Sequence, residues 1–104
     1  MIIEERIYTI VPGQIGNYLK IYTGGPLDLQ KRILGNLIGY FTSETGDLST
    51  LVHLWGYQSL YDRAGRRAQL AREPEWQAYL AACTPLIQKM ENRLLLPTDF
   101  SPIQ

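Results

Sequence analysis

The apolar positions of this chain repeat with two periods, every second residue in some segments and every third or fourth in others. Alternation is typical of strands, because successive strand side chains point to opposite faces, and spacings of three and four are typical of amphipathic helices. Four segments read as strands: 2–11, 36–44, 49–57 and 86–96. Three segments have helical spacing: 14–34, 60–72 and 74–84. The predicted order is therefore strand, helix, strand, strand, helix, strand.

Turn and capping residues stand at the expected boundaries. Pro12-Gly13 closes the first strand, and a turn over 45–47 joins the second and third strands as an antiparallel hairpin. Gly24-Gly25-Pro26 is expected to break or kink the first helical segment. Ser59, followed by Asp62 three residues later, resembles a capping box at the start of the next helix.

This order predicts an α+β fold of the ferredoxin-like βαββαβ type, with a four-stranded antiparallel sheet in the order four-one-three-two and helices on one face. At 104 residues, the whole of 1–104 is expected to be one domain with one core. The opposite sheet face has no cover within the chain. Pairing with an identical sheet in a two-fold homodimer would bury it.

Composition excludes several classes of function. Ten basic and ten acidic residues are spread along the chain, so no basic stripe is available for nucleic acid. There is no run of about 18 apolar residues, so no membrane span is expected. Cys83 and His53 are the only residues of their types, which excludes an internal disulfide and the usual zinc sites. We expect a cytoplasmic protein without metal or cofactor.

The strand 49–57 carries the most informative pattern. Its alternation places His53, Trp55 and Tyr57 together on one surface, while Val52 and Leu54 are expected to enter a conventional core. An aromatic surface that also carries a titratable group favours a ligand or a second protein chain.

Each of these three side chains has two interpretations. His53 can act as a general acid or base, since an ordinary histidine exchanges protons near neutral pH. Alternatively it is a buried histidine bonded to a backbone carbonyl or a carboxylate. Trp55 and Tyr57 either stack on a flat ligand or pack within the dimer or barrel.

The first strand adds a cation and a phenol. Arg6 and Tyr8 share one face, and the expected strand order sets them beside His53, where they can fix a carboxylate or an enolate. The simpler alternative is an ion pair of Arg6 with Glu4, Glu5 or the partner chain. Tyr40, rather than Phe41, is expected to complete the lining, depending on strand register.

Three arginines, Arg63, Arg66 and Arg67, cluster on the helix 60–72. They can draw an anion toward the sheet edge. A solvated helix face with Glu73 and Glu75 nearby is the simpler interpretation. Both remain open at this point.

Several ordered segments resemble the NIPSNAP family. They are Glu5-Arg6-Ile7-Tyr8-Thr9, Pro12-Gly13, Gly39-Tyr40-Phe41-Thr42-Ser43-Glu44-Thr45-Gly46, Val52-His53-Leu54-Trp55-x-Tyr57, Asp62-Arg63-x-x-x-Arg67, Trp76 and Leu95-x-Pro97-x-x-Phe100-Ser101-Pro102. The chain departs from the family at Gly24-Gly25-Pro26 and at Leu48-Ser49. The resemblance implies a dimeric α/β barrel, built from two facing ferredoxin-like sheets, and implies little about activity.

The leading hypothesis is a homodimer that binds a small aromatic or acidic molecule between or beneath its sheets. The expected lining is Arg6, Tyr8, Tyr40, His53, Trp55 and Tyr57. Two alternatives stand beside it. One is a cofactor-independent monooxygenase or lyase, as found on other dimeric α/β barrels, with His53 as acid/base. The other is a protein-interaction module without catalysis.

Overall fold

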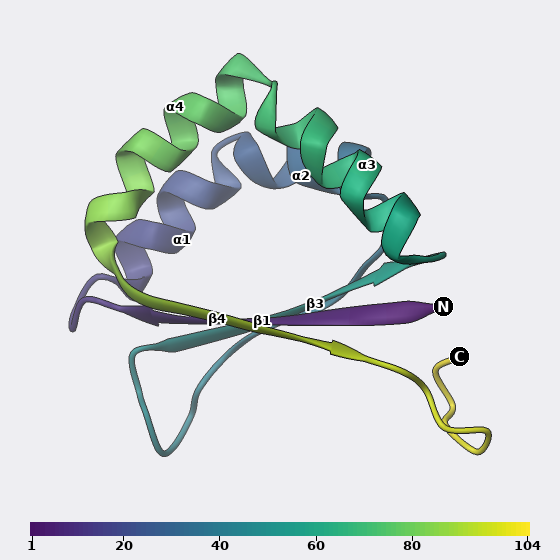
Figure 1. Cartoon of the computed structure of the whole chain (residues 1–104). Coiled ribbons are helices and arrows are strands. Elements are labelled where there is room, and N and C mark those ends of the chain that lie inside the picture. Colours follow the sequence, from purple (N-terminus) through teal and green to yellow (C-terminus); the bar gives the residue numbers. More distant parts are fainter.

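Four antiparallel strands form one sheet, and four helices cover one of its faces (Figure 1). The computed structural model describes residues 1–104. The elements in chain order are β1 (Ile2–Ile10), α1 (Ile15–Thr23), α2 (Pro26–Leu34), β2 (Leu37–Thr42), β3 (Thr50–Tyr57), α3 (Leu60–Ala71), α4 (Pro74–Cys83), a 3₁₀ turn (Thr84–Leu86) and β4 (Ile87–Leu95). The strand order β2-β3-β1-β4 confirms the predicted ferredoxin-like arrangement.

Local sequence signals set the helix boundaries. Gly25 adopts φ of 138°, which side chains other than glycine rarely adopt, and so separates α1 from α2. Pro26 then opens α2 at a position where a missing N–H does no harm. At α3, the Ser59 hydroxyl accepts from the Asp62 N–H at 3.1 Å, and the Asp62 carboxylate accepts from the Gln58 N–H at 3.0 Å. Both the predicted break and the predicted cap are confirmed.

One row of side chains crosses all four strands on the helix-facing side of the sheet. Tyr40 of β2 lies opposite His53 of β3, His53 lies opposite Arg6 of β1, and Arg6 lies opposite Asn92 of β4. Directly paired residues of antiparallel strands share a face. The sheet therefore brings together a phenol, an imidazole, a guanidinium and an amide from four distant parts of the chain.

The prediction that Val52 and Leu54 of β3 enter the core was wrong. His53, Trp55 and Tyr57 are buried against the helices, whereas Val52 and Leu54 are only half-buried on the uncovered face. Both sets of side chains are apolar enough for a core, so alternation alone does not say which set the helices cover. The larger aromatic rings gain more from burial and occupy the helix-facing side.

The opposite face of the sheet has no cover within the chain (Figure 1). Phe41, Val52 and Ile7 form an apolar row across β2, β3 and β1 on this face. Phe41 is 53% exposed, and Ile7 and Val52 are half-buried. In the tail after β4, Phe100 is 88% exposed. No helix in the chain combines the length and apolar character needed to cross a membrane.

Replacing Gly25 by alanine tests the break between α1 and α2. We expect Gly25→Ala to lower the free energy of unfolding by about 1–3 kcal/mol, because the backbone conformation strains an L side chain. A Cβ there would also lie 3.1 Å from the Glu75 carboxylate. Gly65→Ala, within α3 and with open space around the new Cβ, is the control and should stabilise by about 0.5–1 kcal/mol. Equal effects in urea unfolding would contradict this account.

Candidate ligand-binding site

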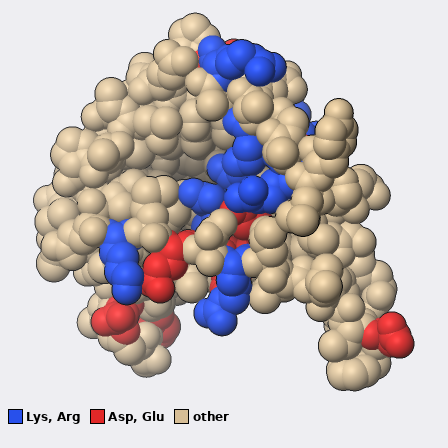
Figure 2. Space-filling view, in the orientation of Figure 1, with Lys and Arg blue, Asp and Glu red and all other residues tan.

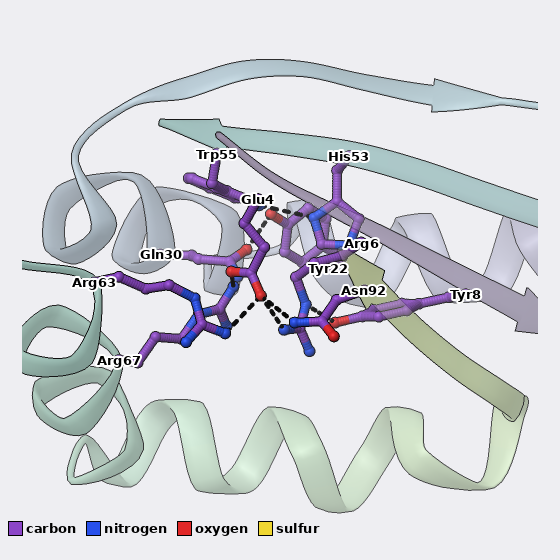
Figure 3. Close-up of polar contacts among 10 residues, drawn as sticks. All are labelled: Glu4, Arg6, Tyr8, Tyr22, Gln30, His53, Trp55, Arg63, Arg67 and Asn92. Atoms are coloured by element: carbon purple, nitrogen blue, oxygen red, sulfur yellow. Dashed lines mark hydrogen bonds and ion pairs between the residues drawn. The ribbon is translucent and has the colours of Figure 1, made fainter. Parts of the chain in front are cut away.

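A fully buried carboxylate, Glu4 of β1, lies at the centre of a polar cluster (Figure 3). Its oxygens accept hydrogen bonds from Arg6 Nη1 at 3.0 Å and Arg63 Nη2 at 2.7 Å. Arg67 Nη2 at 3.1 Å and Asn92 Nδ2 at 2.8 Å complete the set. We call Glu4, Arg6, Arg63, Arg67 and Asn92 the arginine cluster. It joins β1, β4 and α3.

The arginine cluster contains more positive than negative charge. Burial alone would raise the pKa of Glu4, but the hydrogen bonds from Arg63 and Asn92 and the charges of Arg67 and Arg6 outweigh it and lower that pKa to about 2. Glu4 is therefore ionised at neutral pH. Three guanidinium groups still surround this single carboxylate, so the cluster holds an excess of positive charge.

The arginines remain accessible from outside although Glu4 does not. The side chains of Arg6, Arg63 and Arg67 keep 16%, 24% and 22% of their surface exposed, against 0% for Glu4. Figure 2 shows basic side chains in a band that runs from the helical layer toward the sheet, beside a hollow between the two layers. A solvent-borne anion can reach this band.

The solvated helix face expected for the α3 arginines was wrong for Arg63 and Arg67. Both turn to the sheet, and the anion that they meet is Glu4 of their own chain. Arg66 differs, because it pairs with Asp62 at 2.8 Å and donates to the Ile33 carbonyl at 3.0 Å. The ion pair of Arg6 with Glu4, one of the two interpretations of Arg6, is present.

A small cavity lies between the sheet and the helices, next to this cluster. It leaves about 50 Å³ for the centres of water-sized molecules. Most of its wall is aromatic or apolar: Tyr8, Tyr18, Tyr22, Tyr40, His53, Trp76, Tyr79, Cys83, Ile87 and Met90. We call it the aromatic cavity. Tyr40 faces it and Phe41 does not, as the sequence predicted.

The cavity tyrosines are tied down by hydrogen bonds. Tyr18 and Tyr79 join hydroxyl to hydroxyl at 2.6 Å, and the Tyr22 hydroxyl donates to Gln30 Oε1. Burial raises the pKa of Tyr18, Tyr22 and Tyr79, so these phenols stay neutral. Tyr8 connects the two parts of the site, because its hydroxyl accepts from Arg6 Nε at 2.9 Å. The aromatic cavity and the arginine cluster therefore share a wall.

His53 lies between the rings of two tyrosines. The Tyr40 ring stacks on the His53 ring, with 4.4 Å between their centroids. The Tyr8 ring is nearly perpendicular to the His53 ring, with 4.9 Å between their centroids. Its Nδ1 accepts a 2.8 Å hydrogen bond from Trp55 Nε1, instead of either predicted partner. Burial, reinforced by the charges of Arg6 and Arg67, lowers the pKa of His53 to about 3. That environment argues against an acid or base role near neutral pH.

The six residues predicted to line one pocket are only partly brought together. Tyr8, Tyr40 and His53 line the aromatic cavity, and Arg6 stands beside it. Trp55 is fully buried behind His53, and Tyr57 borders a separate recess. Packing is thus the better interpretation of Trp55 and Tyr57. The cavity lies beneath the sheet, on the side of the helices, and not between paired sheets.

Sequence reasoning missed Glu4 as the organising residue. One signal was available, since Glu4 precedes Arg6 and Tyr8 at the same alternation and so faces inward with them. Nothing local links it to Arg63 and Arg67, about sixty residues later. Cys83 is a packed thiol on the cavity wall, and burial raises its pKa.

Substitution of Glu4 tests the charge balance of the arginine cluster. We expect Glu4→Gln to lower the free energy of unfolding by about 3–5 kcal/mol at pH 7. The reason is that three largely buried guanidinium groups would lose their carboxylate partner. Glu5→Gln is the matched control. Glu5 pairs with the exposed Arg93 on the other face, so its loss should cost less than about 1 kcal/mol.

The same pair of variants gives a pH dependence. The lowered pKa of Glu4 stabilises the wild type above about pH 4.5, and this contribution is lost as pH falls toward about 2. Glu4→Gln should lack this part of the acid dependence, and Glu5→Gln should keep it. Urea unfolding as a function of pH measures both, and equal costs for the two variants would contradict the account.

Comparison with known proteins places this architecture in a family. The NIPSNAP family profile matches residues 3–102. A NipSnap homologue of Dictyostelium discoideum is 34% identical over 90% of this chain and 41% of its own length. The NipSnap protein of Drosophila melanogaster is 35% identical over 99% of this chain and 37% of its own length. The chain spans about two-fifths of these relatives.

Solved structures agree along almost the whole chain. A NIPSNAP family protein from Agrobacterium tumefaciens is 51% identical, with a TM-score of 0.96 over 99% of this chain and 98% of that one. A second, of unknown function and from the same organism, is 41% identical, with a TM-score of 0.97 over 100% and 94%. An antibiotic biosynthesis monooxygenase shares only 13% identity at a TM-score of 0.68 over 94% and 99%, which shows a common fold alone. The family profile and these relatives confirm the resemblance, and the chain belongs to the NIPSNAP family.

Proposed function

We propose that this protein binds a small carboxylic acid where the arginine cluster meets the aromatic cavity. The observation that carries the proposal is the charge count: three partly exposed guanidiniums share one buried carboxylate. A second carboxylate, supplied by a ligand, would balance more of this charge. Arginine suits that task, because its planar fork can donate two parallel hydrogen bonds to a carboxylate.

Unused donors support the proposal. Arg63 and Arg67 each reach Glu4 through Nη2, and the Nε–H of both side chains is buried without a hydrogen-bond partner. The Tyr57 hydroxyl, whose pKa the charge of Arg67 influences, is also buried and unpartnered. Buried polar groups in proteins are nearly always paired, so these unpaired groups are unusual. A carboxylate at the margin of the arginine cluster would give them an acceptor.

Cavity size selects the kind of acid. A cavity of roughly 150 Å³ accepts benzene, whereas the aromatic cavity offers about 50 Å³. A short aliphatic acid fits that space. An aromatic acid requires wall side chains to move, the flexible and half-exposed Met90 first among them. Of the two ligand classes expected from the sequence, the acidic one is favoured.

Binding is proposed here, and turnover is not. The monooxygenase or lyase alternative with His53 as acid/base stays a prediction, since the lowered pKa of His53 gives it no support. The structural likeness to an antibiotic biosynthesis monooxygenase, at 13% identity, concerns the fold only.

Butyrate titration tests the binding proposal. We expect the wild type to bind butyrate more tightly than benzoate in isothermal calorimetry or NMR titration. Arg67→Gln should weaken butyrate binding at least about tenfold, because a charge-assisted hydrogen bond is lost. Arg66→Gln, on the same helix but outside the arginine cluster, should bind like the wild type. Absent butyrate binding, or equal loss in both variants, would overturn the proposal.

We further propose that a second copy of the chain covers the bare sheet face. The apolar row Phe41, Val52 and Ile7 runs across β2, β3 and β1 on that face, and the ion pairs Glu5–Arg93 and Lys89–Glu91 border it on the β4 side. An apolar surface bordered by charged groups is typical of protein interfaces. Two-fold pairing makes one such surface complementary to itself.

Sedimentation velocity tests the homodimer. We expect the molecular mass determined for the wild type to be twice the 11.9 kDa mass of one chain. Ile7→Lys should give monomers, since it places a charge in the apolar row of the interface. The monomer should still fold, because the new lysine lies opposite Glu91 and can pair with it. Tyr61→Lys, on an exposed position of α3, is the control and should stay dimeric. A monomeric wild type would refute the homodimer.

A further inference from the structure

We propose that His53 presents its Nε2–H to the aromatic cavity as a fixed hydrogen-bond donor for a ligand oxygen, and that the preferred ligand is therefore a short oxo acid. The inference rests on the proposed carboxylate site and adds a second recognition point to it. It gives His53 a binding role in place of proton transfer.

The tautomer of His53 follows from its partner. The indole N–H of Trp55 can only donate, so the Nδ1 that it reaches at 2.8 Å must offer a lone pair. A neutral imidazole with a lone pair on Nδ1 carries its proton on Nε2. Trp55 thus acts as a positioning residue that fixes both the orientation of the ring and the place of its proton.

The Nε2–H of His53 has no acceptor within the protein. The atom is buried and unpartnered, although His53 lies on the wall of the aromatic cavity. The hydrogen bond to Trp55 and the stack on Tyr40 prevent the ring from turning to find another partner. An oxygen atom that enters the cavity, from water or from a ligand, is the available acceptor.

Burial first, and then the charges of Arg6 and Arg67, keep this donor neutral, and Glu4 opposes them only in part. Tyr8 and Tyr40 are the titratable groups in direct contact with the His53 ring. A polarised carbonyl oxygen gains from the donor and from the nearby arginines together.

The pairing of β1 with β3 relates this donor to the carboxylate site. Arg6 lies directly opposite His53, and Tyr8 contacts both, through its ring with His53 and through its hydroxyl with Arg6. The two recognition points are thus on neighbouring strands. A ligand with a carboxylate at one end and a carbonyl a short distance away matches this arrangement.

Paired acids test the inference separately from the carboxylate site. We expect pyruvate to bind more tightly than propionate, or acetoacetate more tightly than butyrate, by about tenfold, the value of one hydrogen bond to an otherwise unpaired donor. His53→Phe should reduce each of these affinity ratios to about one, whatever its effect on the absolute affinity for butyrate. His53→Gln, which can accept from Trp55 through its oxygen and donate through its amide, should keep part of it. If neither oxo acid surpasses its counterpart while butyrate binds, the inference fails and the carboxylate site stands. If none of the acids binds, the proposed function fails as well.

A long-range ¹H–¹⁵N spectrum of the wild type tests the donor without any variant. His53 is the only histidine, so the imidazole nitrogen signals need not be assigned to a residue, and only Nδ1 and Nε2 must be distinguished. We expect a protonated Nε2 and an unprotonated Nδ1 at pH 7, unchanged down to pH 5, and a shift of the Nε2 signal on addition of the tighter oxo acid. Trp55→Phe should release the tautomer. An Nδ1–H form at pH 7, or an imidazolium by pH 6, would overturn the proposal.

Discussion

A buried carboxylate must be matched by donors, and the way Glu4 meets this requirement determines much of the structure. Its position on β1 turns it toward the helices, where no water can hydrate it. Donors therefore come from β1 itself, from β4 and from α3. The need to pair one buried charge thereby holds α3 against the sheet. An ion pair of this kind specifies geometry more than it adds net stability.

The excess of arginine over carboxylate in the cluster supports a role in anion binding as well as in folding. One guanidinium would balance Glu4, and three leave a field that favours a further anion at the margin of the aromatic cavity. Arg6 belongs to both parts of the site, since it holds Glu4 and donates to the Tyr8 hydroxyl on the cavity wall. The cavity supplies shape, a small volume and one unsatisfied donor at His53. Charge and shape together are the basis on which we propose a small, polar acid as the ligand.

The fold could be predicted from the sequence because its signals are local. Alternation and helical spacing gave the element order, and Gly25 and Ser59 marked boundaries that the structure reproduces. The sheet face covered by helices could not be predicted, since Val52 and Leu54 are as apolar as a core requires. The ion pair of Arg6 with Glu4 was one of the predicted alternatives, but the partners from α3 could not be predicted. Arg63 and Arg67 lie about sixty residues from Glu4, and their local sequence is typical of a solvated helix face. The bond from Trp55 to His53 depends on side-chain rotamers, which no residue pattern specifies.

The most direct test of the carboxylate site is an NMR titration that observes the arginine Nε–H groups while butyrate is added. Arg63 and Arg67 have the buried, unpartnered Nε–H groups that a ligand carboxylate would meet, and Arg66 already donates its Nε–H to Asp62. We expect the signals of Arg63 and Arg67 to shift saturably and together, with that of Arg66 unmoved. Signals that stay in place at saturating butyrate, or that move equally for all three arginines, would contradict the account.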